Sequence, residues 1–96
     1  MLEQLRLEDF SGKIGEKFQL RLDSGETAEI ELIEAAGTGG NPLKRPPFSI
    51  VFRVPEDAIH EQKIYRLEHA ELGEMDLFLV PLGPGETGMR WEAVFT

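Results

Sequence analysis

Apolar residues alternate with polar ones along most of the chain after Gly15, and this period of two is the feature that most constrains the fold. Such alternation is typical of strands that bury one face. We therefore predict an all-β domain of about six antiparallel strands, connected as a meander and closed into a small barrel or a two-layer sandwich. The alternating segments are residues 18–22, 28–32, 48–53, 64–69, 75–82 and 89–95.

The pairing of the first two strands follows from parity. Their apolar residues are all even-numbered, so the two strands share a buried face only if paired positions sum to an even number. A three-residue loop, Asp23-Ser24-Gly25, meets this condition and places glycine where the common turn needs a left-handed residue. This predicts Leu20 opposite Ala28 and Phe18 opposite Ile30.

With 96 residues, the chain is long enough for one hydrophobic core, and we predict a single domain over residues 1–96. Leu7, Phe10 and Ile14 have helix-like spacing, and the glycines among them limit the helix to about one turn near residues 8–13. Residues 37–47 are rich in glycine and proline, which predicts a long surface loop and the most mobile part of the chain.

The fifth predicted strand is apolar on both faces. Met75, Leu77 and Leu79 belong on the core side, which leaves Phe78 and Val80 on the other side. Val94, in the last strand, also lies opposite its strand's core face. An apolar stripe of this kind needs a cover. We expect either a protein partner at Phe78, Val80 and Val94, or the N-terminal segment 1–15 with its leucines Leu2, Leu5 and Leu7.

Composition argues against several classes of partner. Asp and Glu number 18 against 10 Lys and Arg, and the formal net charge of −8 repels phosphate backbones and anionic lipids. No run approaches the roughly 18 apolar residues of a membrane span. The chain has no cysteine, which excludes disulfides and thiolate chemistry and fits a cytoplasmic protein. We predict neither nucleic acid nor membrane as a partner, and no cofactor.

Catalytic patterns are absent from the sequence, so we predict that the protein is not an enzyme. The one local set of metal-capable side chains is Asp57, His60 and Glu61, and a small enzyme or metal-dependent protein built on this loop stays open as an alternative. The second histidine, His69, ends a strand, where its ring would stack or cap the turn. No serine has a histidine and an acid beside it in the sequence.

Tyr65 and Trp91 are in phase with the apolar faces of their strands, which favours core packing. A small-ligand-binding barrel with both rings inside is a second alternative. The remaining acidic residues of the last three strands are expected to form solvent-facing ladders of mixed charge. These residues are Glu68, Glu74, Asp76 and Glu92, with Arg66 and Arg90 as the basic members.

Five segments carry a resemblance over nearly the whole chain. They are Leu7-Glu-Asp-Phe10, Pro47-Phe48-Ser49, Tyr65-Arg-Leu-Glu-His69, Phe78-Leu-Val-Pro81 and Trp91-Glu-Ala-Val-Phe95. The chain resembles a family of small uncharacterised bacterial proteins whose members tend to be encoded beside phage-tail-collar-like proteins. The resemblance implies a role near tail-like or secreted assemblies and supplies no catalytic residues.

These observations favour a non-enzymatic binding or assembly module, accessory to a phage-tail-like or secreted assembly. Its partner would be another protein, or a second copy of the chain in a homo-oligomer.

Overall fold

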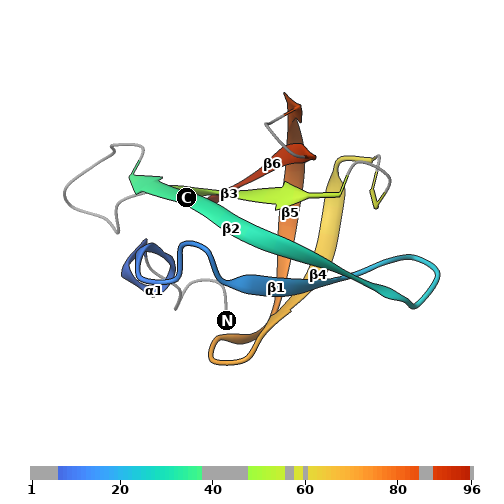
Figure 1. Cartoon of the computed structure of the whole chain (residues 1–96), viewed down its shortest axis with the longest axis horizontal. Helices are drawn as coiled ribbons and strands as arrows, with labels where there is room; N and C mark the ends of the chain where they lie inside the picture. Colours follow the sequence, from blue (N-terminus) through green and yellow to red (C-terminus); the bar gives the residue numbers. More distant parts are fainter. Residues whose placement is uncertain (1–6, 38–47, 56–57, 60, 85–87, 96) are drawn as a thin grey trace.

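The computed structural model describes residues 7–37, 48–55, 58–59, 61–84 and 88–95. These residues form a short helix, α1 (Leu7–Ser11), and six antiparallel strands that close into a small barrel (Figure 1). The predicted all-β fold with an N-terminal helical turn is confirmed, and of the two predicted architectures the chain forms the barrel. The strands are β1 (Lys17–Arg21), β2 (Thr27–Gly37), β3 (Phe48–Val54), β4 (Lys63–His69), β5 (Gly73–Pro84) and β6 (Met89–Phe95).

The predicted meander is wrong. The strand order around the barrel is β1-β2-β3-β6-β5-β4, so β3 pairs with β6 and the barrel closes between β1 and β4. The β3–β6 ladder runs from Phe48 opposite Phe95 to Val54 opposite Met89. Alternation fixes which face of a strand is buried, but it does not say which strands are neighbours. Any order that kept the same residues inside would satisfy the sequence pattern.

The predicted register of the first hairpin is confirmed. Phe18 lies opposite Ile30 and Leu20 opposite Ala28. The turn is closed by the Leu22 amide, which donates to the Glu26 carbonyl at 2.8 Å. Gly25 has a φ of 94°, in the left-handed region that side chains other than glycine rarely adopt.

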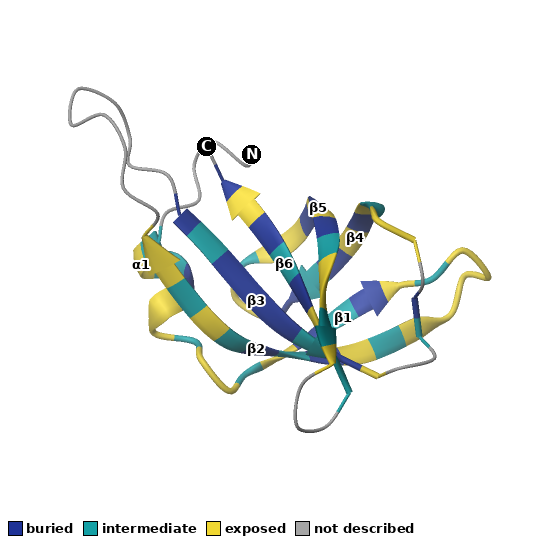
Figure 2. Cartoon of the chain, turned by 90° about the horizontal axis from the view of Figure 1, so that it is seen from above, coloured by how far each residue is buried: buried dark blue, intermediate teal, exposed yellow. Residues whose placement is uncertain are grey.

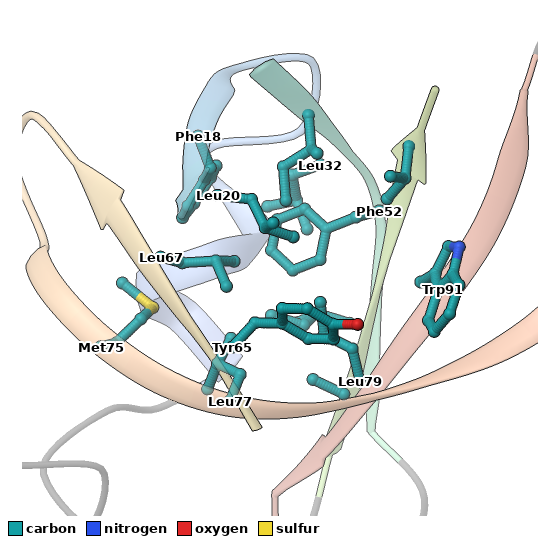
Figure 3. Packing of buried hydrophobic residues seen from close by; sticks show 14 of the residues in the cluster. Phe18, Leu20, Leu32, Phe52, Tyr65, Leu67, Met75, Leu77, Leu79 and Trp91 are labelled. Atoms are coloured by element: carbon teal, nitrogen blue, oxygen red, sulfur yellow. The ribbon is translucent and has the colours of Figure 1, made fainter. Parts of the chain in front are cut away.

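The barrel interior is filled by side chains from all six strands (Figure 3). Figure 2 shows the alternation of buried and exposed residues along β6. Tyr65 and Trp91 are 4% and 2% exposed, which confirms that both rings pack in the core. Val51 departs from the expected alternation: it is 5% exposed although it points away from the core, between Glu34 of β2 and Glu92 of β6.

Helix α1 covers the end of the barrel where β2 ends, β3 begins and β6 ends. Its Phe10 is fully buried, with ring centroids 5.9 Å from Phe48 and 5.5 Å from Phe95. Phe48 and Phe95 stack on each other at 4.5 Å. The three rings close this end of the core, which explains why a five-residue helix is stable here although isolated helices of this length are not. Among the described residues, no helix is long and apolar enough to cross a membrane.

Candidate functional site

Three exposed apolar side chains belong to the outer face of the neighbouring strands β4, β5 and β6. They are Ile64, Phe78 and Val94, with exposed fractions of 65%, 50% and 56%, and we call them the outer apolar row. Ile64 and Phe78 are direct cross-strand partners. Val94 belongs to β6, the other neighbour of β5, and the paired positions of these two strands run from Val80 with Glu92 to Pro84 with Met89.

The position of the row follows from strand alternation. Tyr65 and Leu67 of β4 and Leu77 and Leu79 of β5 point into the barrel, so the residues between them point to solvent. Val80, the next outward residue of β5, is half-buried. Leu82 is 42% exposed further along the same strand. Phe78 therefore belongs to an apolar surface that includes its partner Ile64 on β4 and continues along β5 to Val80.

Charged residues border the row on the side toward the start of β5. Arg66 of β4 lies opposite Asp76 of β5, and its Nε donates to Asp76 Oδ1 at 2.6 Å. Glu74 is also close, with 3.8 Å between its Oε1 and Arg66 Nη1. The hydrogen bond from Arg66, reinforced by its charge, holds the pKa of Asp76 below its usual range. The predicted mixed-charge ladder is therefore present between these strands.

Two of the three members of the row were predicted from sequence as partner-binding residues, Phe78 and Val94. The third, Ile64, was missed. Its signal was its place directly before Tyr65, because a strand that turns Tyr65 inward must turn Ile64 outward. The row as a whole joins residues up to 30 positions apart and depends on the β4–β5–β6 order.

The predicted N-terminal cover stays a prediction. Leu2 and Leu5 lie outside the described residues. Leu7 packs against the core at the β2 end of the barrel, where its Cδ2 atom lies 3.9 Å from the place that a Cβ atom on Gly37 would occupy. Helix α1 contacts β2 and β3, whereas the outer apolar row belongs to β4, β5 and β6.

The predicted metal-binding loop also stays a prediction, because Asp57 and His60 lie outside the described residues. Glu61 is exposed, and its carbonyl oxygen accepts a hydrogen bond from the Tyr65 hydroxyl at 2.6 Å. The described part of the chain contains no group of three or more metal-capable side chains. The predicted loop at residues 37–47 is described only at Gly37, which pairs with Phe48 at the end of β2.

His69 has the structural role expected from its place at a strand end. Its side chain is buried, and its ring lies 4.5 Å from that of Phe18. Its Nδ1 accepts the amide hydrogens of Glu71 and Leu72 at 3.0 and 3.2 Å. Nε2 lies 2.7 Å from a Glu16 carboxylate oxygen. Since Nδ1 accepts two hydrogen bonds, the proton is on Nε2, which donates to Glu16.

A hollow of about 260 Å³ lies between the β1–β2 turn and β4. Leu22, Ile59 and Tyr65 form its apolar part, and Lys63 and Asp23 form an ion pair of 2.6 Å at its rim. Burial raises the pKa of the Tyr65 hydroxyl above its usual value. Tyr65 thus borders a surface hollow, whereas Trp91 does not line it. A ligand site that uses both rings stays a prediction.

Comparisons with known proteins place the chain in a family. No curated protein and no solved structure matches it. A family model with the description "Domain of unknown function (DUF6916)" matches residues 5–95, a range that includes helix α1, all six strands and the whole outer apolar row. The chain therefore belongs to the DUF6916 family.

Proposed function

We propose that this domain is a non-enzymatic binding or assembly module that holds a protein partner on the outer face of β4, β5 and β6. The outer apolar row carries the proposal: each of its three side chains is at least half exposed, and two of them, Ile64 and Phe78, are direct cross-strand partners. Single exposed apolar residues are common on protein surfaces, but contiguous ones are typical of interaction sites.

The composition of the row suits a protein interface. Phenylalanine is among the residues enriched in protein interfaces, and here its cross-strand partner is the branched aliphatic side chain of Ile64. Burying apolar surface stabilises a complex by about 25 cal/mol for each Å² removed from water. Arg66, Asp76 and Glu74 would form a polar rim at one side of this centre.

The net charge of −8 makes nucleic acid and anionic membranes poor partners. We place the domain in the cytoplasm, since its cysteine-free composition suits a reducing compartment. The resemblance to proteins encoded beside phage-tail-collar-like proteins makes a tail-like or secreted assembly the first place to look for the partner.

The proposal is tested by affinity capture from the native cell, comparing the tagged wild-type protein with a Phe78→Glu variant. Phe78 is half exposed, so the substitution should leave the fold intact while it places a charge at the centre of the row. The expected result is loss of the captured proteins from the Phe78→Glu sample, as seen by mass spectrometry. Ile14→Glu is the matched control, because Ile14 is 47% exposed and lies in the turn before β1. Equal capture by all three proteins would contradict the proposal.

A further inference from the structure

We propose that the outer face of β4 and β5 binds a second copy of this chain, in a two-fold symmetric dimer. The inference rests on the proposed function, because it takes the outer apolar row as a binding surface. It goes further by naming the occupant and the way in which the two copies face each other.

The β4–β5 ladder has a self-complementary pattern. Two successive outward pairs are Ile64 with Phe78 and Arg66 with Asp76, so one apolar pair lies beside one pair of opposite charge. A two-fold axis that runs parallel to the strands, midway between β4 and β5, lays β4 of one copy over β5 of the other. Positions along the strands are kept by this rotation.

In this arrangement, Ile64 of each copy faces Phe78 of the other. Arg66 of each copy faces Asp76 of the other, and Glu74, 3.8 Å from Arg66 within the chain, adds a second carboxylate near the same place. The twist between facing sheets is about 30°, and its effect is small near the axis, where these pairs lie. The next outward pair, Glu68 with Glu74, would bring like charges together, but Arg21 lies 3.0 Å from Glu68 and offsets its charge.

A two-fold axis perpendicular to the strands fits less well. It would place Ile64 and Phe78 of one copy over the same residues of the other copy. It would also place Arg66 of one copy over the region of Gln62 of the other, and Gln62 is uncharged. Both charges of the Arg66–Asp76 pair would then lack an opposite charge in the second copy. The charge pattern therefore selects the axis parallel to the strands.

The dimer should be weak and reversible. Stable interfaces bury about 800 Å² on each partner, and the curved outer face of a small barrel limits the contact to the residues near its crest. Two chains of net charge −8 also repel each other. At about 0.15 M salt, this repulsion is screened beyond roughly 8 Å, whereas pairs in contact keep their attraction.

Sedimentation equilibrium of the full chain tests the association directly, over concentrations from about 10 µM to about 1 mM. The expected result is an average mass that rises from the monomer value of 10.8 kDa toward twice that value. Phe78→Glu should remain monomeric throughout, and the Ile14→Glu control should follow the wild type. Circular dichroism melting of each variant checks that the fold is retained.

Charge reversal separates a contact between copies from a contact within one chain. Arg66→Asp alone and Asp76→Arg alone each place like charges opposite each other across the axis, so each should weaken dimerisation by about tenfold or more. When the two variants are mixed, each interface pair again joins opposite charges, while the pair within each chain stays broken. The mixture should form heterodimers about as tightly as the wild type forms homodimers.

Several results would overturn the inference. A wild-type protein that stays monomeric, while Phe78→Glu still loses its captured proteins, would leave the proposed function standing and show that the occupant is another protein. Dimers that form only after removal of residues 1–6 would show that the N-terminal segment covers the face. A mixture that associates no better than either charge-reversed variant would rule out the axis. If Phe78→Glu affects neither dimerisation nor capture, both proposals fail.

Discussion

His69 shows how one polar side chain can hold three parts of the chain together. Its ring packs on Phe18 of β1, its Nδ1 closes the turn at Glu71 and Leu72, and its Nε2 binds Glu16 before β1. A buried polar group stabilises a fold only when it is hydrogen-bonded, and both nitrogens of this ring are.

Replacing His69 with phenylalanine should destabilise the protein. The aromatic ring fits the same space, but two backbone amides lose their acceptor and Glu16 loses its donor. An unsatisfied buried donor costs about 1–3 kcal/mol, and since these groups are part-buried we expect a total loss of about 2 kcal/mol in urea unfolding.

Glu16→Gln is the matched control for this prediction, because the amide oxygen of glutamine can still accept the Nε2 hydrogen. Its cost should stay below about 1 kcal/mol. A cost equal to that of His69→Phe would show that the ring needs a charged partner, and that the proton assignment to Nε2 alone is wrong.

The exposure of Ile64 and the burial of Val51 were not predicted from sequence, and both have the same physical explanation. Ile64 and Val51 both belong to strands whose alternation was recognised, but their exposure depends on what covers the outer face. Ile64 is exposed, and Val51 is buried between the cross-strand neighbours Glu34 and Glu92. Alternation predicts the direction of a side chain, whereas its burial on an outer face depends on strands that are distant in the sequence.

At the scale of the strands, one ion-pair ladder joins β1, β2 and β3. Glu31 of β2 is the cross-strand partner of both Lys17 and Arg53. It lies 3.1 Å from the Lys17 ammonium and also pairs with the Arg53 guanidinium. The hydrogen bond from Lys17, with the nearby charge of Arg53, holds the pKa of Glu31 below its usual range.

This lowered pKa predicts a pH dependence of stability. A carboxyl whose pKa is lower in the folded state stabilises that state above its unfolded pKa, which is about 4.3 for glutamate, and the contribution is lost as the pH falls through the folded pKa. We expect the carboxyl carbon of Glu31 to titrate below the unperturbed value in an NMR pH series. Glu31→Gln should lower the melting temperature at neutral pH and leave less of a difference from wild type near pH 3. A Glu31 carboxyl that titrates at the unperturbed value would contradict the ion-pair ladder of Lys17, Glu31 and Arg53.

Local elements were predictable because their signals lie within a few residues. The six strands, and the register of the β1–β2 hairpin, followed from alternation and from a turn with glycine in its third position. The pairing of β3 with β6 did not, since it joins residues more than 30 positions apart and depends on how the barrel closes. Phe78 and Val94 could be grouped from the sequence, because β5 and β6 follow each other along the chain and are neighbours in the barrel.

At the scale of the whole molecule, the barrel is closed unevenly. The β3–β6 ladder runs along the whole of both strands, and five of the seven residues of β3 are buried. The β1–β4 seam has two paired positions, Gln19 with Glu68 and Leu20 with Leu67. Beyond them, the seam is bridged by side chains: Lys63 pairs with Asp23, and Arg21 with Glu68. Exposed ion pairs of this kind contribute little to stability.

This difference predicts where the barrel opens first. Local opening requires the loss of fewer backbone hydrogen bonds and less buried surface at the β1–β4 seam than at the β3–β6 ladder. In native-state hydrogen exchange followed by NMR, the amides of β4 that point toward β1 should exchange fastest among the strands. The amides shared by β3 and β6 should exchange last, with protection close to that of global unfolding.

Amides of β4 that point toward β5 are the internal control, because they share the strand but belong to the longer β4–β5 ladder. Equal protection on both sides of β4 would contradict the prediction and show that the barrel opens as one cooperative unit.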